Sequence, residues 1–164
     1  MPRLILVCGP VGVGKTTYSL SLSEEVEAVR FSIDPWMQRL FAADMTSLDF
    51  SWMMERVQRC QEQIWETSVQ ILQLDRNVCL DLGFTTKAQR GWITTRAKEL
   101  GIDAELHYLQ ASTNIRWERV EKRNKEKDPA VYSFEVTKMM FDFMEPRFEV
   151  PGEDELKNGC TETM

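Results

Sequence analysis

The sequence of 164 residues predicts an α/β protein in which helices cover both faces of a parallel, doubly wound β-sheet. Short apolar or alternating runs are separated by longer segments with helical periodicity, which is typical of parallel sheets with right-handed crossovers. The first run, at 4–8, leads directly into a glycine-rich turn and a helix. The length suits one domain over 1–164 that buries about 70% of the surface of its unfolded chain.

The elements follow in order from these patterns. Strands are expected at 4–8, 28–33, 77–82 and 102–109. Helices are expected at 15–26, 35–43, 50–74, 86–100, 112–124 and 134–145. Asp34 and Pro35 suit the N-cap and first position of the second helix, and Thr86 with Gln89 forms a capping box for the fourth. Residues 156–164 form a polar tail without a clear strand, so the sheet has about four or five strands.

Residues 9–16 read Gly-Pro-Val-Gly-Val-Gly-Lys-Thr, a complete phosphate-binding loop of the form G-x-x-x-x-G-K-[ST]. Its glycines let successive backbone N–H groups point at phosphate oxygens, and the following helix adds its positive dipole end. Lys15 is expected to reach the β and γ phosphates and Thr16 to ligate Mg²⁺. The expected nucleotide contacts are Gly9, Gly12, Val13, Gly14, Lys15, Thr16 and Thr17.

Two aspartates follow expected strands and are candidates for chemistry. Asp81 interrupts the apolar strand 77–82 and suits the acidic residue that holds magnesium through water. Its alternative role is to cap a loop at the strand end. Asp34 follows the second strand, at the edge of the sheet where ligands bind in α/β proteins. It could accept a proton from an acceptor hydroxyl, or it could serve only as a helix N-cap.

Five arginines are further candidates. Arg116, Arg119 and Arg123 recur at helical spacing and place three guanidinium groups on one stripe, which suits charge developing on phosphoryl oxygens. Arg119 and Arg123 are the expected catalytic pair, and the alternative is a solvated face paired with neighbouring glutamates. Arg39 and Arg90 follow the strands that carry the two aspartates, and we expect them to contact substrate, with a surface role as the alternative.

Composition excludes several classes of function. The net charge of −6 opposes a general affinity for nucleic acid or anionic membrane. No apolar run is long enough for a signal-peptide core or a membrane span, so a cytoplasmic protein is expected. The four cysteines lack C-x-x-C spacing and His107 is the single histidine, which argues against disulfides and structural zinc. We interpret His107 as structural, and the Trp and Met residues of 50–74 as core or as the lining of a substrate pocket.

The motifs together resemble the AAA-type P-loop kinase group, which includes chloramphenicol phosphotransferase, zeta-toxin sugar-nucleotide kinases and polynucleotide kinase domains. The resemblance covers about 3–155 and rests on the motifs at 9–17, 31–34, 78–84, 117–124 and 148–155, with Arg90. It implies a P-loop NTPase three-layer sandwich with a helical lid at about 116–130. It also implies that Asp34 is a general base, that Arg119 and Arg123 are lid arginines, and that Asp81 is the acidic residue of the third strand.

These observations support three functions. The leading one is a kinase that transfers the γ-phosphate of ATP, with Mg²⁺, to a hydroxyl of a small-molecule acceptor. The second is a nucleotide-dependent ATPase or switch that acts on a protein partner, which would place no demand on Asp34. The third is a 5′-hydroxyl polynucleotide kinase, which conflicts with the acidic charge balance. The sequence identifies neither the acceptor nor the oligomeric state, and ATP is preferred over GTP because no N-K-x-D motif is present.

Overall fold

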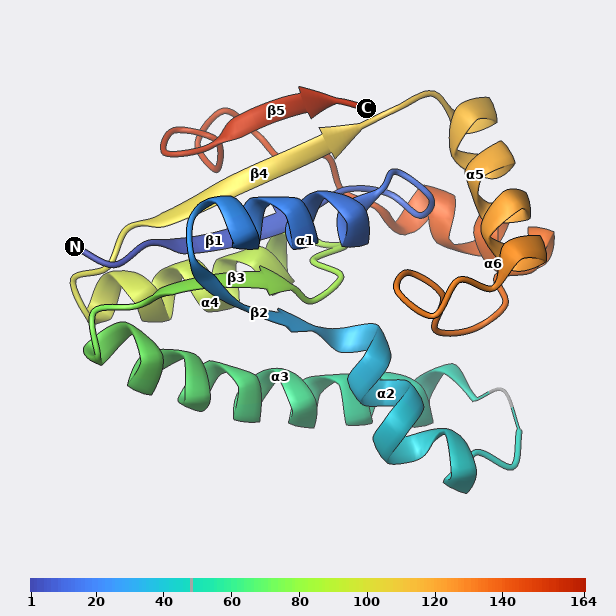
Figure 1. Ribbon diagram of the computed structural model, residues 1–164, viewed down its shortest axis with the longest axis horizontal. Helices are drawn as coiled ribbons and strands as arrows, with labels where there is room; N and C mark the ends of the chain where they lie inside the picture. Colours follow the sequence, from blue (N-terminus) through green and yellow to red (C-terminus); the bar gives the residue numbers. More distant parts are fainter. Residues whose placement is uncertain (48) are drawn as a thin grey trace.

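The computed structural model describes residues 1–47 and 49–164, and these build one all-parallel sheet of five strands (Figure 1). The strands are β1 (Leu4–Cys8), β2 (Ala28–Ser32), β3 (Asn77–Asp81), β4 (Ala104–Gln110) and β5 (Cys160–Thr163). Their order across the sheet is β2-β3-β1-β4-β5. This arrangement confirms the predicted doubly wound architecture, because β2 and β3 lie on one side of β1 and β4 and β5 lie on the other.

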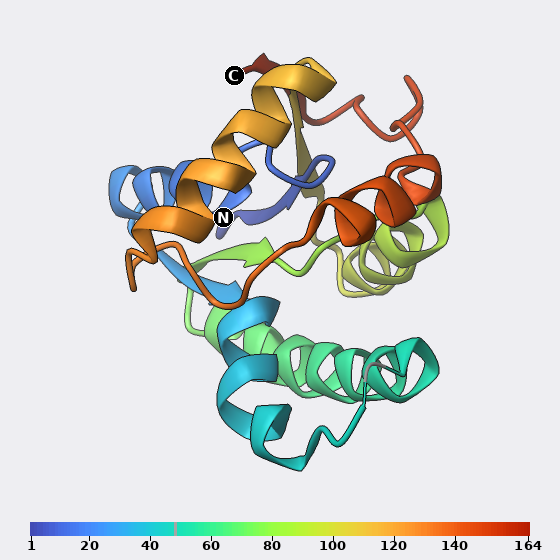
Figure 2. The same cartoon turned by 90° about the vertical axis from the view of Figure 1, so that its right-hand side faces the viewer.

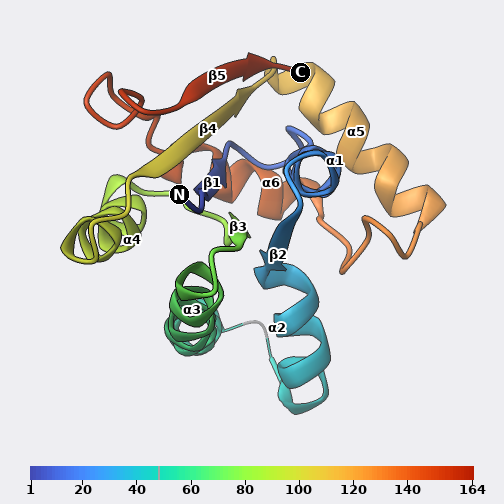
Figure 3. The ribbon, with the colours of Figure 1, turned by 60° about the vertical axis from the view of Figure 1, so that its left-hand side comes forward.

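Helices lie on both faces of the sheet (Figure 3). They are α1 (Lys15–Glu25), α2 (Ile33–Phe41), α3 (Phe50–Gln73), α4 (Lys87–Glu99), α5 (Thr113–Glu126) and α6 (Lys138–Met144), with 3-10 turns η1 (Ala42–Asp44) and η2 (Glu145–Arg147). The α1 helix covers one face, and α3 and α4 cover the other. Within the described residues, no helix combines the length and the apolar character needed to cross a membrane.

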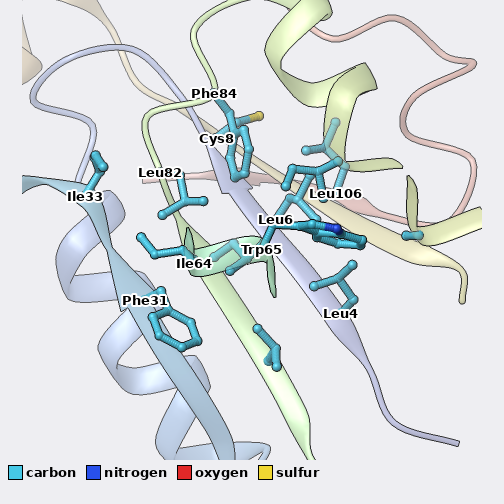
Figure 4. Close-up of a cluster of buried hydrophobic side chains, with 14 of the residues drawn as sticks. Leu4, Leu6, Cys8, Phe31, Ile33, Ile64, Trp65, Leu82, Phe84 and Leu106 are labelled. Carbon is cyan, nitrogen blue, oxygen red and sulfur yellow. The ribbon is translucent and has the colours of Figure 1, made fainter. Parts of the chain in front are cut away.

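The central strand β1 is buried on both sides, which explains its continuous apolar sequence. Successive side chains of a strand point to opposite faces. Leu4 and Leu6 therefore pack against α3 and α4, in the cluster drawn in Figure 4, where Trp65 of α3 lies beside Leu6. Ile5 and Val7 pack on the other face with the α1 side chains. Trp65 thus belongs to the core, one of the two interpretations that the sequence left open.

The prediction that Asp34 is the N-cap of α2 is wrong. The helix begins at Ile33, and Ser32 takes the N-cap position without a side-chain capping bond. Asp34 therefore lies inside the first turn, where its carboxylate is not needed to close the helix end. The capping box of Thr86 and Gln89 at the start of α4 is confirmed by both of its hydrogen bonds.

The prediction that the last helix begins at 134 is also wrong. Asn124 of α5 holds the backbone of Val136 from both sides, since its Nδ2 donates to the Val136 carbonyl at 2.8 Å and its Oδ1 accepts from the Val136 N–H at 3.2 Å. Thr137 then caps Met140 N–H, so α6 begins at Lys138. This tertiary contact accompanies a segment 134–136 that lies outside any helix.

Residues 156–164 are more than the expected polar tail, because Cys160–Thr163 forms β5 and pairs in parallel with β4. The pairing requires a glycine before it. A Cβ at Gly159 would lie 1.9 Å from the Leu106 carbonyl oxygen, so the chain approaches β4 more closely than any side chain would permit. The Met164 N–H then donates to the Gln110 carbonyl. Backbone bonds along one edge define this polar strand, which has no apolar pattern of its own.

Candidate functional site

The carboxyl ends of the strands meet the predicted site residues at one end of the molecule, which faces the viewer in Figure 2. The loop 9–14, the first turn of α2, the α5 helix and the segment 127–137 surround this end. Ligands of open α/β sheets bind at this edge. The fold therefore brings the phosphate loop and the first turn of α2 to the same end.

The phosphate loop is held in the shape that its motif predicts. Gly12 and Gly14 have φ of 78° and 104°, in the left-handed region that favours glycine. A Cβ at Gly12 would also lie 2.5 Å from the Arg116 carbonyl oxygen, so the loop packs directly against α5. The α1 helix begins at Lys15, and its first N–H groups face the loop end. This geometry fits a nucleotide phosphate chain.

Lys15 closes the loop on itself in this structure. Its Nζ donates to the carbonyl oxygens of Gly9 at 2.9 Å and Pro10 at 3.1 Å. Desolvation lowers the Lys15 pKa, while the negative charges of Asp81 and Asp34 act in the opposite direction. Both aspartates are thus close enough to affect the ammonium group, which joins the loop electrostatically to the ends of β2 and β3.

The three arginines of the predicted stripe on α5 have different environments. Arg116 is buried and binds the Val11 carbonyl at 3.0 Å and both oxygens of Glu145 at 2.8 Å, so it fastens the phosphate loop to the segment after α6. Arg119 donates to the Val13 carbonyl at 3.1 Å and lies directly on the loop. The expectation that Arg119 lies beside the phosphates agrees with this position.

Arg123 lies close enough to Asp34 for the two charges to interact. Its Nε is buried without a hydrogen-bond partner among the described residues. Desolvation lowers the Arg123 pKa, and the charge of Asp34 opposes that lowering. A buried guanidinium donor without a partner is costly, and an anion supplied by a ligand would satisfy it. This orphaned donor is an observation that fits a bound triphosphate.

Asp81 is buried at the end of β3 and engaged through a single oxygen. Its Oδ2 accepts from Arg30 Nη2 at 2.8 Å, from Ser19 Oγ at 3.3 Å and from Ser32 Oγ at 3.4 Å. Sequence reasoning did not identify Arg30. The available signal was the alternation of Arg30 and Ser32 on one face of β2, which pairs with β3 so that Ser32 lies opposite Asp81. Mg²⁺ binds oxygen ligands such as a threonine hydroxyl and a carboxylate, so Thr16 and Asp81 fit that ion chemically.

Asp34 remains available for chemistry. Solvent reaches its side chain, and no hydrogen bond to its carboxylate is formed by the described residues. Neighbouring protein atoms still desolvate it in part, and this desolvation, followed by repulsion from Asp81, raises its pKa. Lys15 and Arg123 act in the opposite direction. A carboxylate with a raised pKa between two cations is a stronger base than an ordinary surface aspartate.

Arg90 does not reach the cleft, so the prediction that it contacts substrate is wrong. The side chain is 1% exposed, with Nε donating to Glu155 Oε1 at 2.7 Å and Nη1 to the Phe84 carbonyl at 3.1 Å. Burial of α4 against the sheet requires this guanidinium to be paired internally. Arg90 therefore joins α4 to the segment before β5.

Arg39 does line a cleft beside the phosphate loop. The cleft has a volume of about 300 Å³. The cleft is bounded by Thr16, Arg30, Ser32, Pro35, Gln38, Arg39 and the segment 129–133. A second hollow of about 420 Å³ lies along α5, but its lining residues all belong to that single helix. The first cleft is thus the one that borders the start of α1 at Thr16.

Three of the cysteines and His107 fill structural positions. Cys8, Cys60 and Cys79 are buried free thiols. His107 is buried on β4, and its Nδ1 lies 2.8 Å from the Tyr18 hydroxyl of α1. Among the described residues, no three His, Cys, Asp or Glu side chains gather into a metal-binding cluster.

The parallel sheet, the glycine-rich loop and the helix that follows it define a P-loop protein. The chain belongs to the AAA domain family, whose model matches residues 4–151. This match confirms the resemblance to the AAA-type P-loop kinase group. The comparison with curated proteins gives no match.

Solved structures share the fold at low identity. A sugar kinase from Janibacter sp. HTCC2649 matches with a TM-score of 0.67 and 13% identity, covering 99% of this chain and 86% of the other. A gluconokinase from Sinorhizobium meliloti 1021 matches with a TM-score of 0.66 and 14% identity, covering 99% and 82%. Kti12 from Chaetomium thermophilum, in complex with ADP-AlF3, matches with a TM-score of 0.71 and 17% identity, covering 99% and 88%. These similarities establish the fold.

Proposed function

We propose that the protein is an ATP-dependent kinase that phosphorylates a hydroxyl group of a small molecule. One observation carries the proposal: Asp34 is released from helix capping and precedes Pro35, which lines the cleft, and its raised pKa responds to the nearby charges of Lys15 and Arg123. A purely structural aspartate would use its carboxylate in a cap or an ion pair. The similarity to a sugar kinase and a gluconokinase supports the same class of reaction.

The nucleotide half of the reaction would use groups that are already in place. The N–H groups of 12–16 and the start of α1 would bind the phosphates of ATP, with Lys15 turning from the loop carbonyls toward the β and γ oxygens. Thr16 and Asp81 would hold Mg²⁺, which neutralises phosphate charge when bound. The complex of the similar protein Kti12 with ADP-AlF3 supports a nucleotide at this loop.

The acceptor half would depend on Asp34. The acceptor oxygen forms a bond to the γ-phosphorus, the bond from that phosphorus to the β–γ bridging oxygen breaks, and the acceptor proton passes to the Asp34 carboxylate. Arg119 and Arg123 would stabilise charge on the transferring group, and the orphaned Nε of Arg123 provides a donor for it. Closure of the proposed lid, 116–130, would exclude water, so that ATP hydrolysis without acceptor stays slow.

A test of the proposal measures ADP release from ATP and magnesium across a panel of sugars, antibiotics, nucleosides and oligonucleotides. We expect one acceptor class to stimulate release. Asp34→Asn should reduce the stimulated rate by about 10²- to 10⁴-fold, because a general base contributes that much. Lys15→Ala provides the blank. Asp49→Asn is the matched control, because Asp49 caps α3 through Trp52 N–H and lies outside the cleft.

The same panel tests the alternative of a nucleotide-dependent ATPase or switch that acts on a protein partner. The similar protein Kti12 was solved with ADP-AlF3, so it supports nucleotide binding and does not separate the two functions. Steady ATP hydrolysis that no acceptor stimulates, and that Asp34→Asn leaves intact, would replace the kinase proposal with the switch. Salt-dependent stimulation by an oligonucleotide would instead favour a polynucleotide kinase. The small cleft and the net charge of −6 argue against that third function.

A further inference from the structure

The cleft beside the phosphate loop has an uneven distribution of charge. Its lining includes two arginines, Arg30 and Arg39, and no carboxylate side chain. This contrasts with the chain as a whole, which has a net charge of −6. A positive lining in an acidic protein requires an explanation from the contacts of each arginine.

Arg30 is already neutralised within the protein. Its Nη2 lies 2.8 Å from Asp81 Oδ2, and its Nε donates to Ser19 Oγ at 2.7 Å. Arg39 differs, because among the described residues it forms neither an ion pair nor a hydrogen bond, and its side chain is exposed. Asp34 on the same helix interacts instead with Lys15 and Arg123. Arg39 is therefore the unneutralised cation of the cleft.

Helix geometry directs Arg39 to the cleft together with donors. Pro35, Gln38 and Arg39 are spaced i, i+3 and i+4, so they share one face of α2, and all three line the cleft. Opposite them, Tyr132 and Ser133 add hydroxyl groups. A guanidinium with neighbouring amide and hydroxyl donors is the set that binds a carboxylate or a phosphate group.

Because of the position of Arg39, a carboxylate or phosphate group bound there would lie at a distance from the hydroxyl that reacts. Asp34 and Arg39 are five residues apart, which is about 7.5 Å along a helix axis and about 140° around it, and Asp34 lies beside the residues that line the cleft. A ligand with its hydroxyl at Asp34 and an anionic group near Arg39 would therefore be at least about one sugar unit long. The volume of about 300 Å³ is at the lower limit of small-molecule sites, which agrees with a ligand of that size.

We propose that the acceptor is a small hydroxylated anion, a polyol or sugar that carries a carboxylate or phosphate group, and that Arg39 recognises this group. The inference rests on the proposed kinase function and names its substrate class. The anionic group would be bound about one sugar length from the hydroxyl that receives the phosphoryl group. Arg39 would thus determine specificity while Asp34 performs proton transfer.

The experiment compares acceptors that differ only in the anionic group: glucose, glucuronate and glucose 6-phosphate, and glycerol, glycerate and glycerol 3-phosphate. ADP release gives kcat and KM for each compound with wild type, Arg39→Gln and Arg76→Gln. Arg76 is an exposed arginine before β3, outside the cleft lining, and supplies the same change of charge. Comparison of the carboxylate and phosphate members decides which anion is recognised.

We expect a charged member to exceed its neutral partner, and Arg39→Gln to remove about 10- to 100-fold of that preference through a higher acceptor KM. Arg76→Gln should retain the preference. Equal use of charged and neutral acceptors, or an Arg39→Gln effect on the KM for ATP in place of the acceptor, would overturn the inference and leave the kinase proposal intact.

A binding measurement separates the two proposals if no compound stimulates ADP release. Saturation-transfer NMR in the presence of ADP would detect glucuronate or glucose 6-phosphate on wild type and record its loss in Arg39→Gln. Such binding without turnover would support the anion site and count against the kinase. The absence of binding by every charged compound in wild type would overturn the anion site.

Discussion

The two sides of the cleft are built in opposite ways. On the nucleotide side, the phosphate loop is fixed by Gly12 against the α5 backbone and by Arg116 and Arg119 on its carbonyls. On the acceptor side, Asp34 and Arg39 are exposed and form no hydrogen bond with the described residues. In the proposed kinase, this difference means that the protein would pre-organise binding of the nucleotide and leave the acceptor to complete its own half of the site.

The largest expected effect separates the two sides by their response to ATP. Lys15→Ala should lose both ATP binding and turnover, by about 10³-fold or more in rate, because it removes the cation that contacts the transferring phosphates. Asp34→Asn should lose turnover and bind ATP as wild type does. Calorimetric titration of ATP beside the ADP-release assay measures both quantities. Weakened ATP binding in Asp34→Asn would show that the two sides are not separate.

The next effect concerns the buried arginine of the nucleotide side. Arg116→Met should lower the free energy of unfolding by about 3 kcal/mol, because it leaves Glu145 and the Val11 carbonyl without their partner. ATP affinity should fall as the loop loosens. Denaturant unfolding with and without ATP measures both quantities. Lys122→Met, on an exposed part of α5, is the control and should change neither.

A smaller effect is expected from Gly12→Ala, since it alters only the fit of the loop to α5. The left-handed φ and the 2.5 Å approach to the Arg116 carbonyl together cost about 2 kcal/mol. Gly91→Ala is the matched control, because a Cβ at Gly91 of α4 meets nothing within 4 Å among the described residues. Thermal unfolding should place Gly12→Ala below wild type and Gly91→Ala at or above it.

The smallest expected effect is a pH dependence of stability at His107, on the sheet face that α1 covers and away from both proposed substrates. Desolvation lowers the folded-state pKa of His107, so the unfolded chain binds a proton more readily. The stability from neutral His107 is therefore complete above about pH 6.5, the ordinary histidine value, and is lost as the pH falls through the folded pKa. The fall in Tm on acidification should be shallower in His107→Gln. Parallel slopes for the two proteins would contradict this assignment.

The sequence by itself determined the fold class, the phosphate loop and the positions of the first four strands along the chain. These features depend on local chemistry: a fixed spacing of glycines around Lys15 and apolar runs that must be buried on both faces. The confirmed capping box at Thr86 belongs to the same kind, because its bonds join residues three apart.

Only the tertiary structure decided the rest. The fifth strand exists because Gly159 lets a polar segment reach β4, and α6 starts late because Asn124 holds Val136. Arg90 turned inward to Glu155, whereas Asp34 was released from the cap that its sequence suggested. Apart from that of Asp34, each outcome depends on a partner distant in the chain, and backbone or side-chain bonds of that kind leave no periodicity in the local sequence. The proposed acceptor cleft likewise joins α2 to the distant segment 129–133, which is why the sequence indicated a nucleotide and identified no acceptor.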